Sequence, residues 1–280
     1  MVRRRRRAGR PRRRVDLRKA LLVLPNMVTL ASVLCGFLAI QTVAKDLPTV
    51  DDFYGAAVLL IFAMLFDMMD GRIARLTKTQ SQFGLHLDSL ADVISFGVAP
   101  ALLVYKWALY RYPLAGTAAA FVFVAAGVIR LARFNVLTVD ADAKGPGKYI
   151  TGLPIPPAAG ILVSLLLVNH ALGGALGDEQ YTLPLLAVTV VTSLLMVSTV
   201  RFRSFKDLRV NRGTLFLVLL GVGSSLLVWH VSRKPQFVLV WLPCLYVLVG
   251  LIEAAHRLTM KLIRLVTRED SLVPPREEPS

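Results

Sequence analysis

The sequence has 280 residues, of which 55% are hydrophobic, and it carries a formal net charge of +15 at pH 7. Its mean hydropathy of +0.59 is too high for an ordinary soluble domain, because such domains cover their surface with polar side chains. The composition therefore excludes a soluble globular enzyme and predicts an all-α polytopic membrane protein. Cys35 and Cys244 stand far apart without ligand-type neighbours, so the sequence suggests neither a disulfide framework nor a cysteine zinc site.

Eight transmembrane helices are predicted with a window of about 20 residues, the length that crosses a hydrocarbon core. In chain order they cover residues 26–44, 53–72, 86–107, 114–133, 153–170, 182–200, 214–231 and 237–256. The organisation that follows is a basic cytoplasmic arm over 1–19, a membrane domain over 20–210, two additional C-terminal transmembrane helices within 211–256, and a cytoplasmic tail over 257–280 that we expect to be disordered.

Basic residues are distributed unevenly among the predicted connections, and this bias sets the orientation of the chain. With the N-terminus inside, 28 of the 33 lysines and arginines fall in cytoplasmic segments. We therefore expect both termini to be cytoplasmic and the protein to lie in the inner (cytoplasmic) membrane of the cell. Topology and anionic lipid headgroups then account for the basic charge, so we expect membrane lipids and no nucleic acid as partners.

Four aspartates interrupt the second and third predicted spans: Asp67, Asp70, Asp88 and Asp92. Ionisable residues inside membrane helices are functional candidates by default, because each costs about 2.5–3.5 kcal/mol at the membrane centre. The short connection between the two spans makes them antiparallel neighbours, and spacings of three and four residues place each pair on one helix face. We expect the four carboxylates to converge in one pocket that faces the cytoplasm.

Carboxylates that are crowded in this way repel one another unless positive charge is supplied. The available ligands are oxygen atoms, which favour magnesium or manganese, with two ions per subunit as one arrangement. Such a site suits phosphoryl transfer, in which the cations neutralise a diphosphate and an attacking hydroxyl loses its proton.

The residues around the aspartates form the pattern DxxDGxxAR, eight residues, and then GxxxDxxxD. Its positions are Asp67, Asp70, Gly71, Ala74, Arg75, Gly84, Asp88 and Asp92. Gly71 and Ala74 have no side chain or only a methyl group, which leaves the helix backbone accessible where a nucleotide could approach. The guanidinium of Arg75 offers several N–H donors for phosphate oxygens. The pattern resembles the signature of the CDP-alcohol phosphotransferase family at all eight positions.

This resemblance implies a six-helix core with a hydrophilic cavity at its cytoplasmic face, two divalent metals and a homodimer. It also implies that Asp67, Asp70 and Asp88 are metal ligands, and that Asp92 is a metal ligand or the general base toward the acceptor hydroxyl. A carboxylate beside a metal is chemically suited to accept that proton.

Within the family, the flanking segments resemble the membrane-embedded bacterial phosphatidylserine synthase branch. These segments are Leu24-Pro25-Asn26 with Thr29 and Gly36, LDSLADVISFGVAP from Leu87, ARFNV from Ala132, GLPIPP from Gly152, and SFK from Ser204. The branch implies CDP-diacylglycerol as donor and L-serine as acceptor. The implied CDP-binding residues are Asn26, Thr29, Asp67, Gly71, Ala74, Arg75 and Gly84.

A serine site needs a cation for the carboxylate group, and the later spans supply candidates at their cytoplasmic ends. These candidates for acceptor or lipid-phosphate binding are Arg130, Arg133, Asn135, Lys148 and Lys206. Each of the basic ones could instead be a positive-inside anchor.

Other functions stay open at this point. The same chemistry could use glycerol 3-phosphate or inositol phosphate as acceptor. A cation transporter would be expected to repeat the acidic motif in its second half, and a membrane prenyltransferase would need two separate aspartate-rich motifs. The chain has a single such motif.

Overall fold

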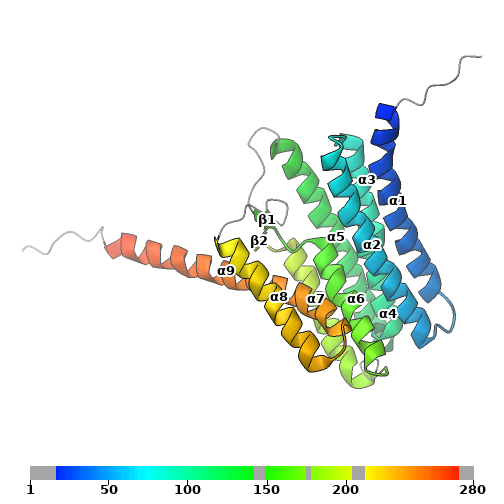
Figure 1. Ribbon diagram of the computed structural model, residues 1–280. Coiled ribbons are helices and arrows are strands. Elements are labelled where there is room, and N and C mark those ends of the chain that lie inside the picture. Colours follow the sequence, from blue (N-terminus) through cyan, green and yellow to red (C-terminus); the bar gives the residue numbers. More distant parts are fainter. Residues whose placement is uncertain (1–16, 142–148, 175–177, 204–211, 271–280) are drawn as a thin grey trace, which may run out of the picture.

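The computed structural model describes residues 17–141, 149–174, 178–203 and 212–270 (Figure 1). Within this part of the chain, six helices are long and apolar enough to cross a membrane, and shorter apolar helices cover Ile155–Ala171 and Leu219–Ser232. Each of these eight helices falls on one predicted span, which confirms the prediction of an all-α polytopic membrane protein. Two of the proposed binding residues, Lys148 and Lys206, lie outside the described residues.

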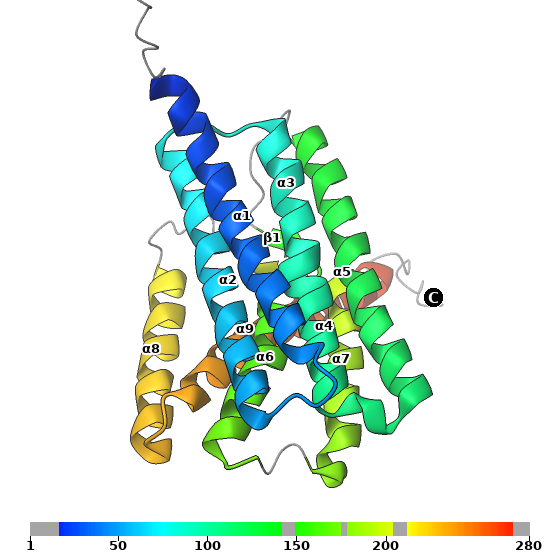
Figure 2. The same ribbon diagram turned by 90° about the vertical axis from the view of Figure 1, so that its right-hand side faces the viewer.

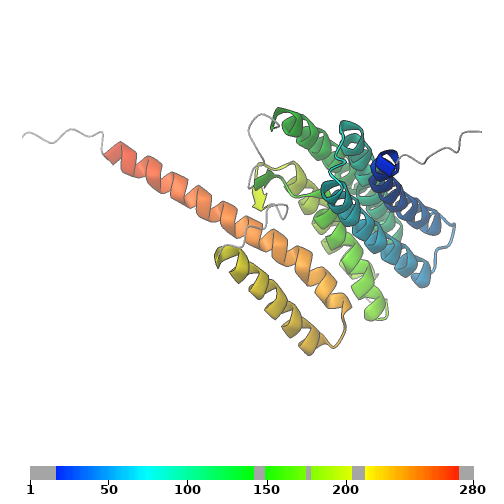
Figure 3. The ribbon, with the colours of Figure 1, turned by 45° about the horizontal axis from the view of Figure 1, so that its top comes forward.

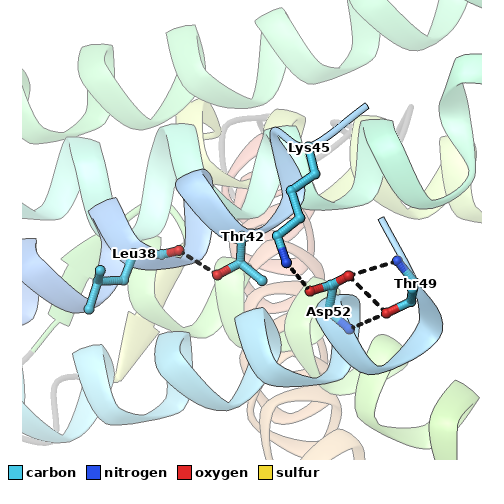
Figure 4. Close-up of polar contacts among 5 residues, drawn as sticks. All are labelled: Leu38, Thr42, Lys45, Thr49 and Asp52. Atoms are coloured by element: carbon cyan, nitrogen blue, oxygen red, sulfur yellow. Dashed lines mark hydrogen bonds and ion pairs between the residues drawn. The ribbon is translucent and has the colours of Figure 1, made fainter. Parts of the chain in front are cut away.

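Helices α1 (Leu17–Val43) and α2 (Val50–Leu76) form an antiparallel pair (Figures 1 and 2). Thr49 caps α2: its hydroxyl accepts a hydrogen bond from the Asp52 N–H at 3.2 Å, and the Asp52 carboxylate accepts one from the Thr49 N–H at 2.9 Å (Figure 4). Lys45 pairs with Asp52 at 2.5 Å. These contacts satisfy the first N–H groups of the helix and fix the α1–α2 turn at the end opposite the aspartates.

Residues 82–107 form one helical span in three parts. These are α3 (Gln82–Asp92), a π-helical turn (Val93–Val98) and α4 (Ala99–Trp107). The N-terminus of α3 and the C-terminus of α2 lie at the same end of the bundle (Figure 2). The chain thus brings both aspartate-bearing segments to the same end.

The π-helical turn begins directly after Asp92. Pro100 has no N–H to donate to the preceding turn, and the Ala99 N–H bonds to the Ile94 carbonyl five residues earlier. A π turn inserts one extra residue into the helix and rotates the parts on either side relative to each other. The orientation of Asp92 is therefore set partly by this local departure from the α-helix.

Small side chains allow α1 to approach both neighbouring helices closely. The Ser32 hydroxyl donates to the Ala63 carbonyl at 3.0 Å, and the Ser95 hydroxyl donates to the Ser32 carbonyl at 3.1 Å. A Cβ added to Gly36 would lie 2.8 Å from Ser95 Oγ and 2.9 Å from its Cα. The α1 backbone therefore contacts the π-helical turn directly. This contact holds α1 against the segment that follows Asp92.

Three further helices complete the bundle: α5 (Pro113–Ala141), α6 (Ile155–Ala171) and α7 (Thr182–Val197). Short 3-10 helices, Leu109–Arg111 and Glu179–Tyr181, precede α5 and α7. The interior between the helices is largely apolar, and its largest fully buried side chains include Leu60, Phe96, Phe123 and Leu162.

A two-stranded sheet, which an all-α prediction does not include, lies at the edge of the bundle. Strands β1 (Tyr149–Thr151) and β2 (Arg201–Arg203) pair antiparallel, with Ile150 opposite Phe202. Gly152 follows β1 with a φ of +79°, and its N–H bonds to the Val200 carbonyl at 2.7 Å. Three-residue strands far apart in sequence are too short to leave a periodic pattern, so the prediction missed them.

Helices α8 (Arg212–Ser232) and α9 (Gln236–Asp270) lie side by side outside the bundle, and α9 contacts α6 and β2 (Figure 3). Helix α9 continues to Asp270, into the segment 257–280 where we expect a cytoplasmic tail. This stretch contains good helix formers and neither proline nor glycine, so the helix has no reason to end at the predicted membrane boundary. Residues 271–280 lie outside the described part.

Candidate active site

Three of the four aspartates meet where the end of α2 faces α3. One carboxylate oxygen from each of Asp67, Asp70 and Asp88 lies within 4.8 Å of the others. Asp70 is buried with 4% of its surface exposed, whereas Asp67 and Asp88 are half-buried. The i, i+3 spacing on α2 and the short connection to α3 produce this arrangement, as the sequence pattern predicts.

Asp92 adjoins the cluster one turn further along α3. Its side chain lies within hydrogen-bonding reach of Asp67 and interacts electrostatically with Asp88. The residue is buried with 8% of its surface exposed, and its Oδ1 atom has no hydrogen-bond partner. Asp92 is thus a second buried carboxylate of the group, at the junction with the π-helical turn.

The residues present fit a hard divalent cation. Buried carboxylates at this separation repel one another, and Asp70 Oδ2 is a second buried oxygen without a hydrogen-bond partner. All donors in the cluster are carboxylate oxygens, the ligands that magnesium and manganese prefer. A cation held by the cluster would offset this repulsion and would give Asp70 Oδ2 a partner.

Two predicted nucleotide-binding residues on α1 line the same end of the bundle. Thr29 is buried, lies within hydrogen-bonding reach of Asp70, and donates to the Pro25 carbonyl at 3.1 Å. Asn26 faces Gly84 of α3, since a Cβ added to that glycine would lie 3.6 Å from Asn26 Oδ1. Helix α1 therefore contacts both aspartate-bearing segments.

The predicted nucleotide-binding residues on α2 face outward beside the cluster. A Cβ added to Gly71 would meet nothing within 4 Å, so packing within the protein does not require glycine there. Arg75 is exposed, and its Nε donates to the Gly71 carbonyl at 3.0 Å, while Ala74 is half-buried. The open space above Gly71 allows a ligand to approach the helix backbone.

Arg130 of α5 is a predicted acceptor-site residue that is buried within the bundle. Its side chain has 7% of its surface exposed, interacts electrostatically with Asp92, and stacks over the Phe134 ring at 5.8 Å. Its Nε has no hydrogen-bond partner. A buried guanidinium with an unsatisfied N–H group is suited to bind an anionic oxygen.

The other predicted acceptor residues are placed differently. Asn135 donates from Nδ2 to Ser89 Oγ at 2.9 Å, and Ser89 bonds in turn to the Leu85 carbonyl at 3.1 Å. Arg133 is exposed. Asn135 thus links α5 to α3 next to Asp88.

Sequence reasoning missed three contributors to this region. Ser89 follows a motif aspartate directly, and that position was the only available signal. Phe202 and Tyr246 carry no pattern that predicts their contact, yet their ring centroids lie 5.8 Å apart where α9 meets β2.

The fold and the carboxylate cluster define a polytopic membrane protein with a carboxylate site, suited to divalent cations, near one end of its helix bundle. The chain belongs to the CDP-alcohol phosphatidyltransferase family, whose profile matches residues 22–199. This match includes all four aspartates and ends before β2, α8 and α9. The resemblance to this family expected from the DxxDGxxAR pattern is therefore confirmed.

Curated relatives place the chain more closely within the family. It is 38% identical over 200 residues to the CDP-diacylglycerol–serine O-phosphatidyltransferase of Helicobacter pylori, which covers 71% of this chain and 80% of the relative. The protein of that name from Bacillus subtilis is 33% identical over 183 residues, covering 65% and 91%. The archaetidylserine synthase of Methanothermobacter thermautotrophicus is 37% identical over 187 residues, covering 65% and 70%.

Proposed function

We propose that this protein transfers the phosphatidyl group of CDP-diacylglycerol to the hydroxyl of L-serine, giving phosphatidylserine and CMP. The observation that carries the proposal is the carboxylate cluster of Asp67, Asp70 and Asp88 within the family-matched segment. The names of the bacterial relatives support serine as the acceptor. The archaeal relative is named for a serine product too.

The reaction breaks the phosphoanhydride bond of the CDP-diacylglycerol diphosphate and forms a phosphodiester bond to serine. The serine hydroxyl oxygen attacks the phosphorus that carries the diacylglycerol, the bond from that phosphorus to the CMP phosphate breaks, and CMP leaves with the bonding electrons. Asp92 takes the hydroxyl proton, because its buried carboxylate has an oxygen without a protein partner next to the cluster. Arg130 binds an anionic group of the substrates, either the serine carboxylate or a phosphate.

Asp67, Asp70, Asp88 and Asp92 would hold the divalent cations, magnesium or manganese, with two per subunit as the proposed number. Such cations neutralise the diphosphate charge and stabilise the leaving CMP. Asn26, Thr29, Gly71, Ala74, Arg75 and Gly84 would surround the CDP moiety together with Asp67. The low helix surface at Gly71 leaves room for the nucleotide.

The placement of the protein in the cell is part of the proposal. The bias of basic residues supports cytoplasmic termini and an active site open to the cytoplasm, in the cytoplasmic membrane. The aspartate site would then draw serine and release CMP on the cytoplasmic side. A homodimer, as the family resemblance implies, would be checked by the mass of the detergent-solubilised protein.

The experiment that tests the function is CMP release by purified protein in detergent with CDP-diacylglycerol and magnesium or manganese. L-serine, glycerol 3-phosphate, inositol phosphate or no acceptor is added in parallel. Release that depends on serine and stops with EDTA is the expected result. Release with a different acceptor would contradict the serine assignment, and no release with any acceptor would contradict the enzymatic proposal.

A further inference from the structure

Helix α9 is longer than a bilayer requires. It has 35 residues, so at 1.5 Å per residue its length is about 52 Å, whereas the hydrocarbon core of a bilayer is about 30 Å thick. Its apolar, membrane-spanning part is Gln236–Ala255. Residues 256–270, which we call the α9 extension, continue the same helix and contain six charged side chains. Such a segment belongs outside the hydrocarbon core.

The α9 extension points away from the rest of the molecule. Figures 1 and 3 show the C-terminal end of α9, in red, leading away from the other helices. Two side chains near its start are described, Thr259 and Met260, and both are exposed, Met260 with 41% of its surface. The extension is therefore accessible to a partner outside the helix bundle.

Helical spacing separates the basic residues of the α9 extension from its apolar ones. Residues at intervals of three and four share one face of a helix. Four basic residues follow the spacing four, three, four: Arg257, Lys261, Arg264 and Arg268. Four apolar residues follow the spacing four, three, one on a different face: Leu258, Leu262, Leu265 and Val266. The extension is thus an amphipathic helix with a basic face and an apolar face.

Both faces match the surface of an anionic bilayer. A helix of this kind lies in the plane of the interface, with its apolar face at the boundary of headgroups and acyl chains. Each Lys or Arg near an anionic surface strengthens binding about fivefold. A nucleic acid would contact the basic face and leave the apolar face in water. Because the extension directly follows the membrane span Gln236–Ala255, it begins at the membrane surface.

We propose that the α9 extension is an interfacial helix that binds the headgroups of anionic phospholipids through its basic face. Its apolar face then enters the boundary between headgroups and acyl chains. This inference goes beyond the proposed function, since it assigns no step of the reaction. It predicts that the apolar face is shielded from water when the bilayer carries negative charge.

The test measures the depth of a nitroxide spin label on the full-length protein in nanodiscs. The label is attached at Leu262→Cys in a protein that also carries Cys35→Ala and Cys244→Ala. Discs contain phosphatidylcholine alone or a mixture with phosphatidylglycerol. Collisions with the uncharged, water-soluble complex Ni-EDDA report exposure to water. We expect this exposure to be about fivefold or more lower in the anionic discs, the effect of at least one basic residue at the surface.

Two further label positions show whether the helix is inserted and which way it faces. A label on the native Cys244, which is exposed within the membrane span, should be shielded in both kinds of disc. A label at Arg264→Cys, on the basic face, should stay accessible to Ni-EDDA in both. The Cys244 label thereby confirms that the protein is folded and inserted.

Neutralising the basic face tests the role of its charge. With Arg257→Gln, Lys261→Gln, Arg264→Gln and Arg268→Gln combined, the label at residue 262 in anionic discs should be as accessible as it is in phosphatidylcholine. The matched control removes four charges from the N-terminal arm, by Arg3→Gln, Arg4→Gln, Arg5→Gln and Arg6→Gln, and should change nothing at residue 262.

Three results would overturn the inference. One is equal exposure of the label at residue 262 in the two kinds of disc. Another is equal exposure at residues 262 and 264 in anionic discs, because an interfacial helix shields one face. The third is unchanged shielding after the basic face is neutralised. The measurement needs no substrate, so its outcome does not depend on the proposed reaction.

Discussion

Asn135 of α5 donates a hydrogen bond from Nδ2 to Ser89 Oγ of α3 at 2.9 Å. The bond crosses between two helices at the residue that follows Asp88, so it braces the carboxylate cluster from the α5 side. The engagement of Asn135 with Ser89 favours this bracing role over direct contact with the acceptor.

If Asn135 is a brace, Asn135→Ala and Ser89→Ala should have the same effect. Each should lower the free energy of unfolding by about 1 kcal/mol, the usual contribution of one hydrogen bond, and reduce kcat to a similar extent. The double variant should be no worse than either single one. Kinetics with purified protein and chemical denaturation in detergent provide the measurements. A rise in serine KM for Asn135→Ala alone, with Ser89→Ala silent, would instead support acceptor binding.

Removal of one carboxylate from the cluster should make the Tm of the protein less dependent on the divalent cation. Without added metal, Asp70→Asn should raise the Tm, because repulsion among three carboxylates within 4.8 Å is relieved. The increase in Tm that manganese gives the wild type should be smaller or absent in this variant, since a ligand is lost. Asp178→Asn, at an exposed site away from the cluster, is the control. A full manganese shift in Asp70→Asn would contradict a cation site at these residues.

Gly71→Ala should lower activity without lowering stability. The added Cβ meets nothing within 4 Å, and alanine is the better helix former, so the Tm should stay the same or rise slightly. If a nucleotide lies against this backbone, kcat/KM for CDP-diacylglycerol should fall at least tenfold. Gly55→Ala on the same helix also meets open space, so it should have the same small effect on the Tm and leave kcat/KM unchanged. Normal activity of Gly71→Ala would move the nucleotide site elsewhere.

Gly36→Val, in contrast to Gly71→Ala, should lower stability, because it disrupts the packing of α1. A Cβ there already lies 2.8 Å from Ser95 Oγ, so a larger side chain forces α1 away from the π-helical turn. We expect a loss of about 1–3 kcal/mol in stability, the usual cost of overpacking a tight contact. Thermal denaturation of this variant beside Gly55→Val, where the added Cβ meets nothing, provides the comparison. Equal stability of the two variants would show that α1 can shift without cost.

Much of this architecture can be predicted from sequence because the membrane imposes strong rules. Hydropathy alone places all eight helices, and a carboxylate such as Asp70 stands out because an apolar span has no structural use for it. Helical spacing and a short connection then bring the aspartates together.

The remaining features depend on contacts that sequence patterns do not encode. The π-helical turn arises where Pro100 removes a donor, but a proline alone does not determine how the helix compensates. The pairing of Ile150 with Phe202 joins segments far apart in sequence. The contact of Tyr246 with Phe202 depends on how α9 packs outside the bundle, and no periodicity predicts which residue of its apolar part, Gln236–Ala255, faces inward.

The most direct test of the central claim is CMP release by Asp92→Asn beside the wild type, with CDP-diacylglycerol, L-serine and manganese. Asparagine preserves the shape of the buried side chain and cannot accept the hydroxyl proton, so turnover should fall about 10²-fold or more. The variant should keep its Tm and its binding of CDP-diacylglycerol. Serine-dependent CMP release at the wild-type rate would contradict the account, because the reaction would then not use this carboxylate.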